Sequence, residues 1–541
     1  MEPMSDARKG MGRRDAIRAI AAGAAAAAAA VPALAARDAG LDGSGLDGSG
    51  LTWLSAGQLR ALMVARKVSA REVTAHFLDR IDRLEPLLHA FVHVDREGAL
   101  AAADRADAAL AQGKPPGPLH GVPVAVKDNL WAKGMPATCG SLIFARFRPS
   151  FDGTVVERLR AAGAIIVGKT NMPEFAAWPR SHSLVAGESV NPWDRTRIAG
   201  ASSGGCSAAV AAGMVPVAIG TDGGGSIRIP SALCGIVGLF PTLGRVPDYG
   251  GFHCSPGGSA GPMTRSVADA ALLQQVIAGH DPRIRSTRQL ADVDVLSGLD
   301  SGVNGLRIAW SRDFGHLSPD PLVADMVQAA LGMLDGAGAA VSAVADHIAH
   351  PWGDDGAMMA PIQQAVGAGG YATVPTGAIP DTQSAESWLA EASAIPGRTV
   401  FEIPEFRELY ARHTGLLTPP QRLLTNIRPA SGNPPSADEL RAVMDRIFEK
   451  HDVLCSPTMA VVAPVAPPGW AQPYPDLFMG TNFTFIANAT ARPAVTVPCG
   501  FVRDLPVGLQ IIGRPGDEAT VLRVAAAVEQ ALGPAPQPPV S

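Results

Sequence analysis

Apolar residues recur at helical spacing in two stretches just after Leu51. Between Ser55 and Glu85 this pattern predicts two amphipathic helices, and Ser69 followed by Glu72 is the sequence of a capping box at the start of the second. Residues 517–532, DEATVLRVAAAVEQAL, carry the same spacing near the end of the chain. A third amphipathic helix is therefore predicted there.

Short apolar runs bounded by turn-forming residues follow these helical patterns. Residues 121–129 (GVPVAVKDN), residues 164–167 and the run that ends at Asp222 have the composition of strands buried on both faces. A helical pattern precedes each of the last two, and this alternation favours an α/β fold. Further strands are predicted within 451–457, 491–500 and 507–513.

The N-terminus has the pattern of an export signal. Residues 1–35 combine a basic start, an Ala-rich apolar segment and an A-x-A site that ends at Ala35. The Arg13-Arg14 pair resembles a twin-arginine signal, which predicts a bacterial protein that is periplasmic or secreted. Residues 36–50 repeat LDGSG and predict a flexible linker, followed by a single domain over 51–535. No other stretch approaches the ~20 apolar residues of a membrane span.

Composition narrows the function classes. With 47% hydrophobic and 18% charged residues the chain is expected to be globular, and its net charge of -5 becomes -7 without residues 1–35. A mildly acidic chain without a basic tract is a poor nucleic-acid binder. The six cysteines show neither C-x-x-C nor zinc-type spacing, so no metal and no cofactor are expected. An oxidising compartment would permit disulfides, whose pairing the sequence leaves open.

Residues 163–170, GAIIVGKT, match the phosphate-loop pattern but do not predict a nucleotide site. A phosphate loop needs a strand before its first glycine and a helix opening at its lysine. Here the intervening residues Ala-Ile-Ile-Val favour the strand itself, and Gly163 follows a helical pattern. The segment is therefore predicted to be a strand and the turn before it.

Two segments match the hydrolase elbow G-x-S-x-G, which requires a strand running into its serine. Ser259 follows a Gly- and Pro-rich stretch and is predicted to lie in a loop. Ser202 and Ser203 lack an apolar strand before them but precede a good helix, so both are predicted at its N-terminus, Ser203 as an N-cap. A Ser-His-Asp esterase that uses Ser202 stays open as an alternative.

The segment 218–235, AIGTDGGGSIRIPSALCG, places three glycines and Ser226 directly after a buried strand. Glycines lift the Cβ restriction on backbone dihedrals and allow a substrate to approach the main chain. Successive N–H groups can then point at one developing negative charge, as in an oxyanion hole. Ser226 is therefore a candidate nucleophile.

None of the twelve histidines lies in these motifs, so no histidine is an obvious general base. A buried lysine loses its proton readily because burial disfavours its charged form. Lys127, at the end of the apolar run 121–127, is the candidate.

Taken together, these segments resemble the amidase signature family, whose Gly- and Ser-rich motifs this chain repeats over most of its length from Leu51. The matching segments are HGVPVAVKDN, GKTNMPEFA, NPWD, GASSGGCSAAVAAG, GTDGGGSIRIPSALCGIVG, GPMTRSVAD and LPVGLQIIG. The resemblance implies an α/β amidase signature fold, with a large mixed β-sheet core flanked by helices on both faces.

The resemblance also implies a Ser-Ser-Lys triad. Ser226 would be the nucleophile, Ser202 the bridging serine after a cis peptide bond, and Lys127 the base. The amides of the glycine turn would form the oxyanion hole, and three further residues match positions that support the triad. These two sets are Gly223, Gly224, Gly225 and Ser226, and Ser203, Asp222 and Arg228.

Three positions depart from the family pattern. Gly223 stands where many relatives have Thr, Ala201 where Gly is usual, and Phe240 in place of a common Lys. None of these changes removes a catalytic atom. Gly223 is expected to loosen the oxyanion turn, and Phe240 puts a supporting charge at its position in doubt.

The leading hypothesis is an exported amidase or acylamidase that hydrolyses the C–N bond of a small or peptide-like amide and also accepts esters or carbamates. A tRNA-dependent amidotransferase A subunit shares the motifs, although an export signal argues against it. A non-catalytic binding protein on the same fold is the third candidate. Specificity is expected from residues 280–450, where Trp352 and Trp388 line a pocket or pack a core. The oligomeric state stays open.

Overall fold

The computed structural model describes residues 48–284, 290, 292–349, 377–418, 421, 435–469 and 482–540. Eleven strands form its main sheet, and two short ribbons pair β4 (His182–Ser183) with β5 (Gly187–Glu188) and β6 (Val190–Asn191) with β7 (Asp194–Ile198). The strands of the main sheet are β1 (Phe91–Val94), β2 (Pro123–Lys127), β3 (Ile165–Thr170), β8 (Val217–Asp222), β9 (Val237–Phe240), β10 (Ser259–Thr264), β11 (Arg307–Trp310), β12 (Ala340–Ala343), β13 (Val453–Pro457), β14 (Ala494–Val502) and β15 (Leu505–Ile512).

Helices connect and cover these strands. Their bounds are α2 (Gly48–Thr52), α3 (Ala56–Val64), α4 (Ala70–Leu88), α5 (Arg96–Ala111), α6 (Thr154–Ala161), α7 (Gly204–Ala211), α8 (Arg228–Cys234), α9 (Val267–Ile277), α10 (Pro321–Gly336), α12 (Glu386–Ser393), α13 (Pro404–Arg412), α15 (Ala437–Lys450), α16 (Asn482–Ala489) and α17 (Glu518–Leu532). Helix α2 begins three residues before the expected start of the folded body.

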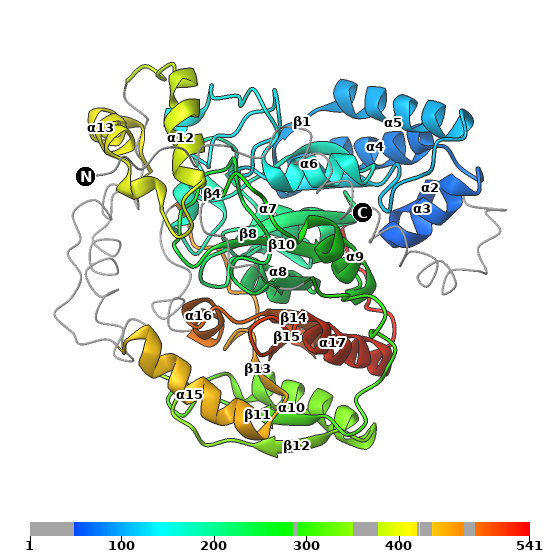
Figure 1. The fold of residues 1–541 in the computed structure, drawn as a ribbon, viewed down its shortest axis with the longest axis vertical. Coiled ribbons are helices and arrows are strands. Elements are labelled where there is room, and N and C mark those ends of the chain that lie inside the picture. Colours follow the sequence, from blue (N-terminus) through cyan, green and yellow to red (C-terminus); the bar gives the residue numbers. More distant parts are fainter. Residues whose placement is uncertain are drawn as a thin grey trace, which may run out of the picture.

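The main sheet is mixed and runs the length of the molecule. Its order is β1-β3-β2-β8-β10-β9-β14-β15-β13-β11-β12, from top to bottom in Figure 1. Strand β2 is parallel to β3 and β8, and β11 is parallel to β12 and β13, whereas the remaining pairs are antiparallel. The predicted α/β class with a large mixed sheet is confirmed.

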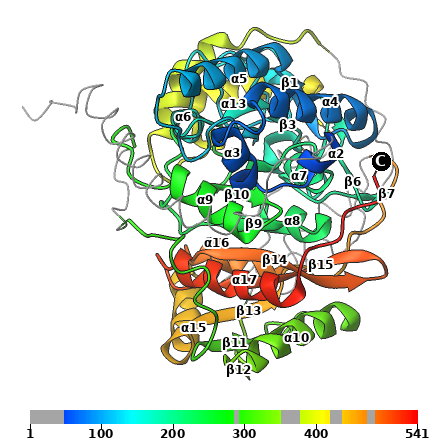
Figure 2. The same ribbon diagram turned by 90° about the vertical axis from the view of Figure 1, so that its right-hand side faces the viewer.

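Alternating residues of the strands face two different cores, which places helices on both faces of the sheet. In β13, Val453 and Cys455 belong to the core shared with α10 and α17, while Leu454 belongs to the core shared with α15 and α16. Figure 2 shows α17 lying across β14 and β15. A third core, rich in phenylalanine, joins α12 and α13 to the loops after β2.

The local predictions near the N-terminus hold. Helices α3 and α4 occupy the predicted segment, and Ser69 accepts from the Glu72 amide while the Glu72 carboxylate accepts from the Ser69 amide. Ser55 and Gln58 form a second capping box, at the start of α3. The predicted strands and the closing helix are present as β2, β3, β8, β13, β14, β15 and α17.

The predicted loop position of Ser259 is wrong, because Ser259 is the first residue of β10 and pairs with Asp222. Backbone pairing along β8 outweighs the turn propensity of the glycines before it. Strand β3 continues through Lys169 to Thr170, three residues beyond the predicted end. The lysine of the phosphate-loop match thus lies within a strand.

The parallel pairing of β2 with β8 positions the candidate base. All five residues of β2 are buried, and Val124–Val126 pair with Val217–Ile219. Because parallel strands end at the same edge of a sheet, Lys127 and the turn after Asp222 lie at one edge. This is where an open α/β sheet offers a binding crevice.

The predicted signal peptide, residues 36–47 of the predicted linker and Trp352 lie outside the described residues. Trp388 is described and packs beside the phenylalanine-rich core, on α12. Within the described ranges, no helix combines the length and apolar character needed to cross a bilayer.

Candidate active site

A pocket of about 400 Å³ opens at the edge of the sheet where β2 and β8 end. Ser202 and Ser226 both line it. Most of the remaining lining is apolar. It includes Phe175, Trp178, Ile198, Ile229, Leu233, Phe252 and Phe485.

Lys127 is completely buried beside this pocket, and its ammonium nitrogen has three near neighbours. Its Nζ lies 2.7 Å from Ser202 Oγ, 2.9 Å from Thr221 Oγ1 and 3.1 Å from the Thr221 carbonyl oxygen. Burial lowers the pKa of Lys127 from 10.5 to about 8. The neutral form is therefore far more accessible than it is for a lysine in water.

The three contacts fit a neutral lysine. An amine has two N–H donors and one lone pair. Thr221 supplies two acceptors, since its hydroxyl proton points to Asn129 Oδ1, 3.4 Å away. In the ammonium form Nζ donates to Ser202 Oγ, and in the neutral form the lone pair can accept the hydroxyl proton of Ser202 instead, so this geometry allows a proton to pass between the two.

Ser202 and Ser203 precede α7, as predicted, and the peptide bond between Ala201 and Ser202 is cis, as the resemblance implies. Ser203 is the N-cap residue by position but makes no side-chain capping bond. Its hydroxyl instead donates to the Thr221 carbonyl (3.1 Å), and its amide donates to the Ser226 carbonyl (3.1 Å). Through these two hydrogen bonds, Ser203 links the loop that carries Ser202 to the strand end and turn that carry Ser226.

Ser226 lies at the end of the glycine turn and is half-buried. The Gly225 amide donates to Asp222 Oδ1 at 2.6 Å and is thereby occupied. Within the described chain the amides of Gly223, Gly224 and Ser226 donate to no protein acceptor. Three of the four candidate oxyanion donors are thus available to a ligand.

The glycines are required by close neighbours. A Cβ on Gly224 would lie 2.2 Å from the Phe485 ring, and one on Gly225 would lie 2.2 Å from Thr484 Oγ1. Gly225 also has a φ of +123°, which side chains rarely adopt. At Gly223 a Cβ would meet the Ser255 side chain at 2.4 Å. Ser255 thus fills the space that a threonine at position 223 would need.

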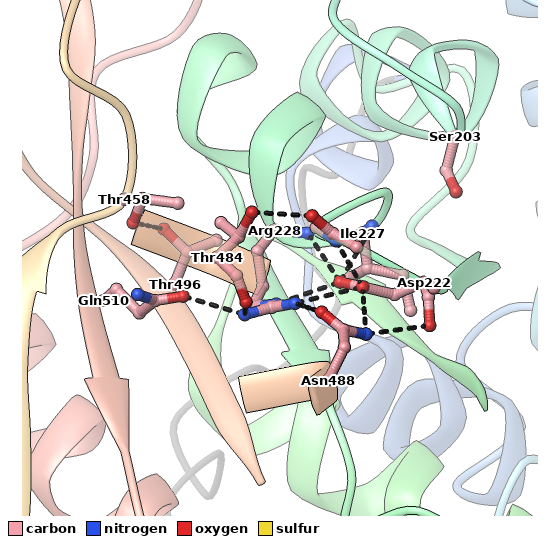
Figure 3. A network of polar contacts seen from close by, with 12 residues as sticks. Ser203, Asp222, Ile227, Arg228, Thr458, Thr484, Asn488, Thr496 and Gln510 are labelled. Carbon is pink, nitrogen blue, oxygen red and sulfur yellow. Dashed lines mark hydrogen bonds and ion pairs between the residues drawn. The ribbon is translucent and has the colours of Figure 1, made fainter. Parts of the chain in front are cut away.

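Asp222 and Arg228 form a buried ion pair beneath the turn, and neither side chain is exposed. All five guanidinium N–H groups have acceptors: Nε and Nη2 donate to the Asp222 carboxylate, and the others reach three residues of the C-terminal part (Figure 3). Those acceptors are Thr484 O (2.7 Å), Gln510 Oε1 (2.8 Å) and Asn488 Oδ1 (2.6 Å).

This network keeps the carboxylate charged. Burial alone would raise the pKa of Asp222, but the Arg228 charge and hydrogen bonds from Arg228, Asn488 and Gly225 outweigh it and lower that pKa. The aromatic ring of Phe240 covers the guanidinium, with its centroid 5.0 Å from the Arg228 Cζ. Phe240 therefore supports this cation rather than supplying a charge of its own.

Replacing Arg228 by methionine is expected to destabilise the protein by about 3–5 kcal/mol, because Asp222 would be left buried without its partner. The shift of the urea unfolding midpoint measures this loss. The matched control is Arg307→Met, which breaks the surface pair with Asp452 and should cost far less. Equal shifts for the two variants would contradict the role given to the buried pair.

One histidine does reach the pocket. His253 lines it together with Asp248, and its Nε2 lies 2.6 Å from the Asp248 carbonyl oxygen and 3.6 Å from the carboxylate. No hydrogen bond joins His253 to Ser202 or Ser226 in the described structure. Ser202 Oγ contacts Lys127 instead, which weakens the Ser-His-Asp alternative.

Sequence reasoning did not select several residues of the site. Thr221 follows directly from the glycine motif, because it is the residue before Asp222 and ends the same strand. Gln510 lies in the matching segment LPVGLQIIG, but nothing local to it or to Asn488 indicates Arg228, which they contact from 282 and 260 positions away.

The chain is similar to known proteins over most of its length. A family model described as Amidase matches residues 72–352 and 435–522. The chain belongs to the amidase signature family. The glutamyl-tRNA(Gln) amidotransferase A subunit of Chloroflexus aurantiacus is 37% identical to this amidase-signature protein over 500 residues, covering 88% of this chain and 96% of the relative.

Solved structures of the family have the same fold. A bacterial aryl acylamidase superimposes with a TM-score of 0.70 at 29% identity and covers 88% of this chain and 96% of its own. The peptide amidase of Stenotrophomonas maltophilia gives 0.67 at 29% identity, over 90% and 98% of the two chains. The amidase-signature protein is thus an enzyme that breaks amide C–N bonds, either by hydrolysis or by amide transfer.

Proposed function

We propose that the protein is an amidase that hydrolyses small or peptide-like amides through a covalent acyl-enzyme on Ser226. Lys127 is the general base and Ser202 carries the proton between them. The observation that supports this most is the 2.7 Å contact between Lys127 Nζ and Ser202 Oγ at the wall of a pocket that Ser226 also lines.

In the first half of the reaction, neutral Lys127 takes the proton of Ser202 as Ser202 takes the proton of Ser226. The freed Ser226 Oγ attacks the amide carbonyl carbon. The carbonyl oxygen becomes negatively charged, and the amides of Gly223, Gly224 and Ser226 are the donors available to stabilise it.

In the second half, the leaving nitrogen needs a proton, because an amine is too basic to depart as an anion. Ser202 donates that proton and recovers one from Lys127. Water then attacks the acyl-enzyme and passes a proton through Ser202 to Lys127, and that proton returns through Ser202 to Ser226 Oγ as the acid leaves. Esters and carbamates would pass through the same acyl-enzyme.

An amidotransferase A subunit is the second candidate, and the curated relatives favour it. The relative from Chloroflexus aurantiacus, at 37% identity over 88% of this chain, carries that description. Both candidates break an amide C–N bond and require the same nucleophile. They differ in the fate of the nitrogen, which the amidase releases and the amidotransferase passes to an acceptor.

The pocket lining argues for the amidase. Its described residues include several aromatic and aliphatic side chains and neither Lys nor Arg. The buried Lys127 close by is occupied by Ser202 and Thr221, and the buried Arg228 is occupied by Asp222 and its three C-terminal acceptors. Such a surface suits an amide with an apolar acyl group better than one with a free carboxylate.

Export belongs to the proposal as well. It is supported by the twin-arginine pattern of residues 1–35 and would place the enzyme in the periplasm or outside the cell. A substrate from the environment would then reach it directly.

The test is to treat the purified protein with a fluorophosphonate probe and to locate the labelled serine by peptide mass spectrometry. We expect the label on Ser226, and we expect the chain alone to release amine from an apolar anilide. Label on Ser202 would favour the Ser-His-Asp alternative. Labelling of Ser226 with turnover only in the presence of added partner proteins would favour the amidotransferase, and no label with no turnover would contradict both.

A further inference from the structure

Two cysteines meet at the rim of the candidate active site. Cys139 is fully buried, Cys254 is half-buried and lines the pocket, and their sulfur atoms are 3.6 Å apart. The sulfurs of Cys206, Cys234 and Cys499 contact backbone carbonyl oxygens, as the Cys254 sulfur also does with the Phe252 carbonyl. Only a modest approach separates the Cys139–Cys254 pair from the ~2.05 Å of a disulfide bond.

Cys139 belongs to the loop that leads from the candidate base. Its neighbours on both sides are held by Asp128, whose carboxylate accepts from the Thr138 hydroxyl and amide and from the Gly140 amide. Asp128 directly follows Lys127. The carbonyl of Cys139 also accepts from the amide of Phe175, which lines the pocket. Cys139 is therefore held in place by the segment that carries the candidate base, Lys127.

Cys254 belongs to the loop that supports the glycine turn. The hydroxyl of Ser255, the next residue, donates to the Gly223 carbonyl at 3.2 Å. That contact is possible because Gly223 has no Cβ, which would collide with the Ser255 side chain. Cys254 is therefore one residue from the group that holds the first candidate oxyanion donor in place.

We propose that Cys139 and Cys254 are a redox modification site: a low-molecular-weight disulfide such as oxidised glutathione converts them to an internal disulfide. That bond would tie the loop of the base to the loop behind the glycine turn. Thiol-based reductants would reverse it.

The chemistry balances as two exchange steps. The Cys254 thiol, which faces the pocket, loses its proton and attacks one sulfur of oxidised glutathione, releasing one glutathione thiol and leaving a mixed disulfide. The Cys139 thiol then loses its proton and attacks the Cys254 sulfur, releasing the second glutathione thiol. The two cysteines lose two electrons and two protons, and the oxidant gains them.

The order of these steps follows from burial. Burial raises the pKa of the Cys139 thiol, so its thiolate is scarce and it cannot be the first nucleophile. Cys254 is the thiol that an oxidant in the pocket can reach. Cys139 then acts as the resolving thiol at short range.

Formation of the Cys139–Cys254 disulfide is expected to lower the rate at which Ser226 reacts. The sulfurs must approach by about 1.5 Å, which shifts the Cys254 loop and disturbs the contact of Ser255 with the Gly223 carbonyl. A misplacement of that size in a catalytic turn costs roughly ten- to a hundredfold in rate. This consequence rests on the proposed function, whereas formation of the bond does not.

The experiment equilibrates the full chain in reduced and oxidised glutathione, blocks free thiols and searches proteolytic peptides for a Cys139–Cys254 link. We expect the link in the wild type and in the control Cys499→Ala, whose sulfur lies in β14. In Cys139→Ala, glutathione should accumulate on Cys254, because the resolving thiol is gone. The rate of fluorophosphonate labelling of Ser226 should fall about tenfold in oxidised wild type and recover with dithiothreitol.

Oxidised wild type that carries glutathione on Cys254 without an internal link, or that keeps both thiols, would overturn the proposal. A link that leaves the labelling rate of Ser226 unchanged would overturn its effect on the site. If the proposed function fails, no buffer yields turnover, yet the linked peptide still appears. The two failures are therefore distinguishable.

Discussion

Replacing Ser226 by alanine lowers amide turnover by ~10⁴-fold or more, because the variant has no oxygen to form the acyl-enzyme. The substitution removes one atom from a half-buried side chain at the pocket wall. The Ser226 carbonyl still accepts from the Ser203 amide, so the turn keeps its attachment. The loss should therefore appear in kcat, with little change in substrate binding. Release of amine from an apolar anilide measures it.

Ser231→Ala is the matched control. Ser231 is buried on α8, and its hydroxyl has no partner among the described residues. Its replacement should leave turnover close to that of the wild type. Appreciable turnover in Ser226→Ala would contradict the assignment of the nucleophile, whereas equal losses in both variants would point to damage of the fold around α8.

Replacing Lys127 by methionine should lower kcat/KM by about 10³- to 10⁴-fold and abolish a characteristic pH dependence. The lowered pKa of Lys127, about 8, means that the base is mostly protonated below that pH and mostly neutral above it. Wild-type activity should therefore rise by roughly tenfold per pH unit towards pH 8 and level off above it. The residual activity of Lys127→Met should lack that rise, so the gap between the two widens as the pH increases.

Lys133→Met is the control, since Lys133 is an exposed lysine in the loop that follows Lys127. Its profile should match that of the wild type. A wild-type profile that is flat through pH 8, or a rise near pH 8 that persists in Lys127→Met, would contradict the role of Lys127 as base.

Local signals in the sequence predicted the elements that hold the site. The Ser69 capping box lies where expected, and the apolar run before Lys127 is a buried strand because β3 and β8 flank it on both sides. The glycines before Ser226 predicted an exposed backbone, and the close approach of Phe485 and Thr484 explains why side chains are excluded there. These properties depend on spacing and on residue type alone.

Long-range contacts could not be predicted in this way. Ser259 opens a strand only because β8 offers it a partner. From the sequence, Phe240 is expected only to remove the charge of the lysine common at that position. In the structure its ring covers the Arg228 guanidinium. The availability of the Gly223 amide and the occupation of the Gly225 amide depend on where the Asp222 carboxylate points. Such facts follow from the fold rather than from any segment of it.

The long-range contacts of Arg228 have a consequence for folding during synthesis. This side chain joins the turn beside Ser226 to Thr484, Asn488 and Gln510, which lie 256 to 282 positions further along the chain. A ribosome synthesises those residues 256 to 282 positions after Arg228. The nascent chain therefore carries its reactive serine through that whole stretch before the cation beneath the turn finds its last acceptors. Activity should accordingly emerge only once β15 has been made, and truncation before β15 should leave the reactive turn unsupported.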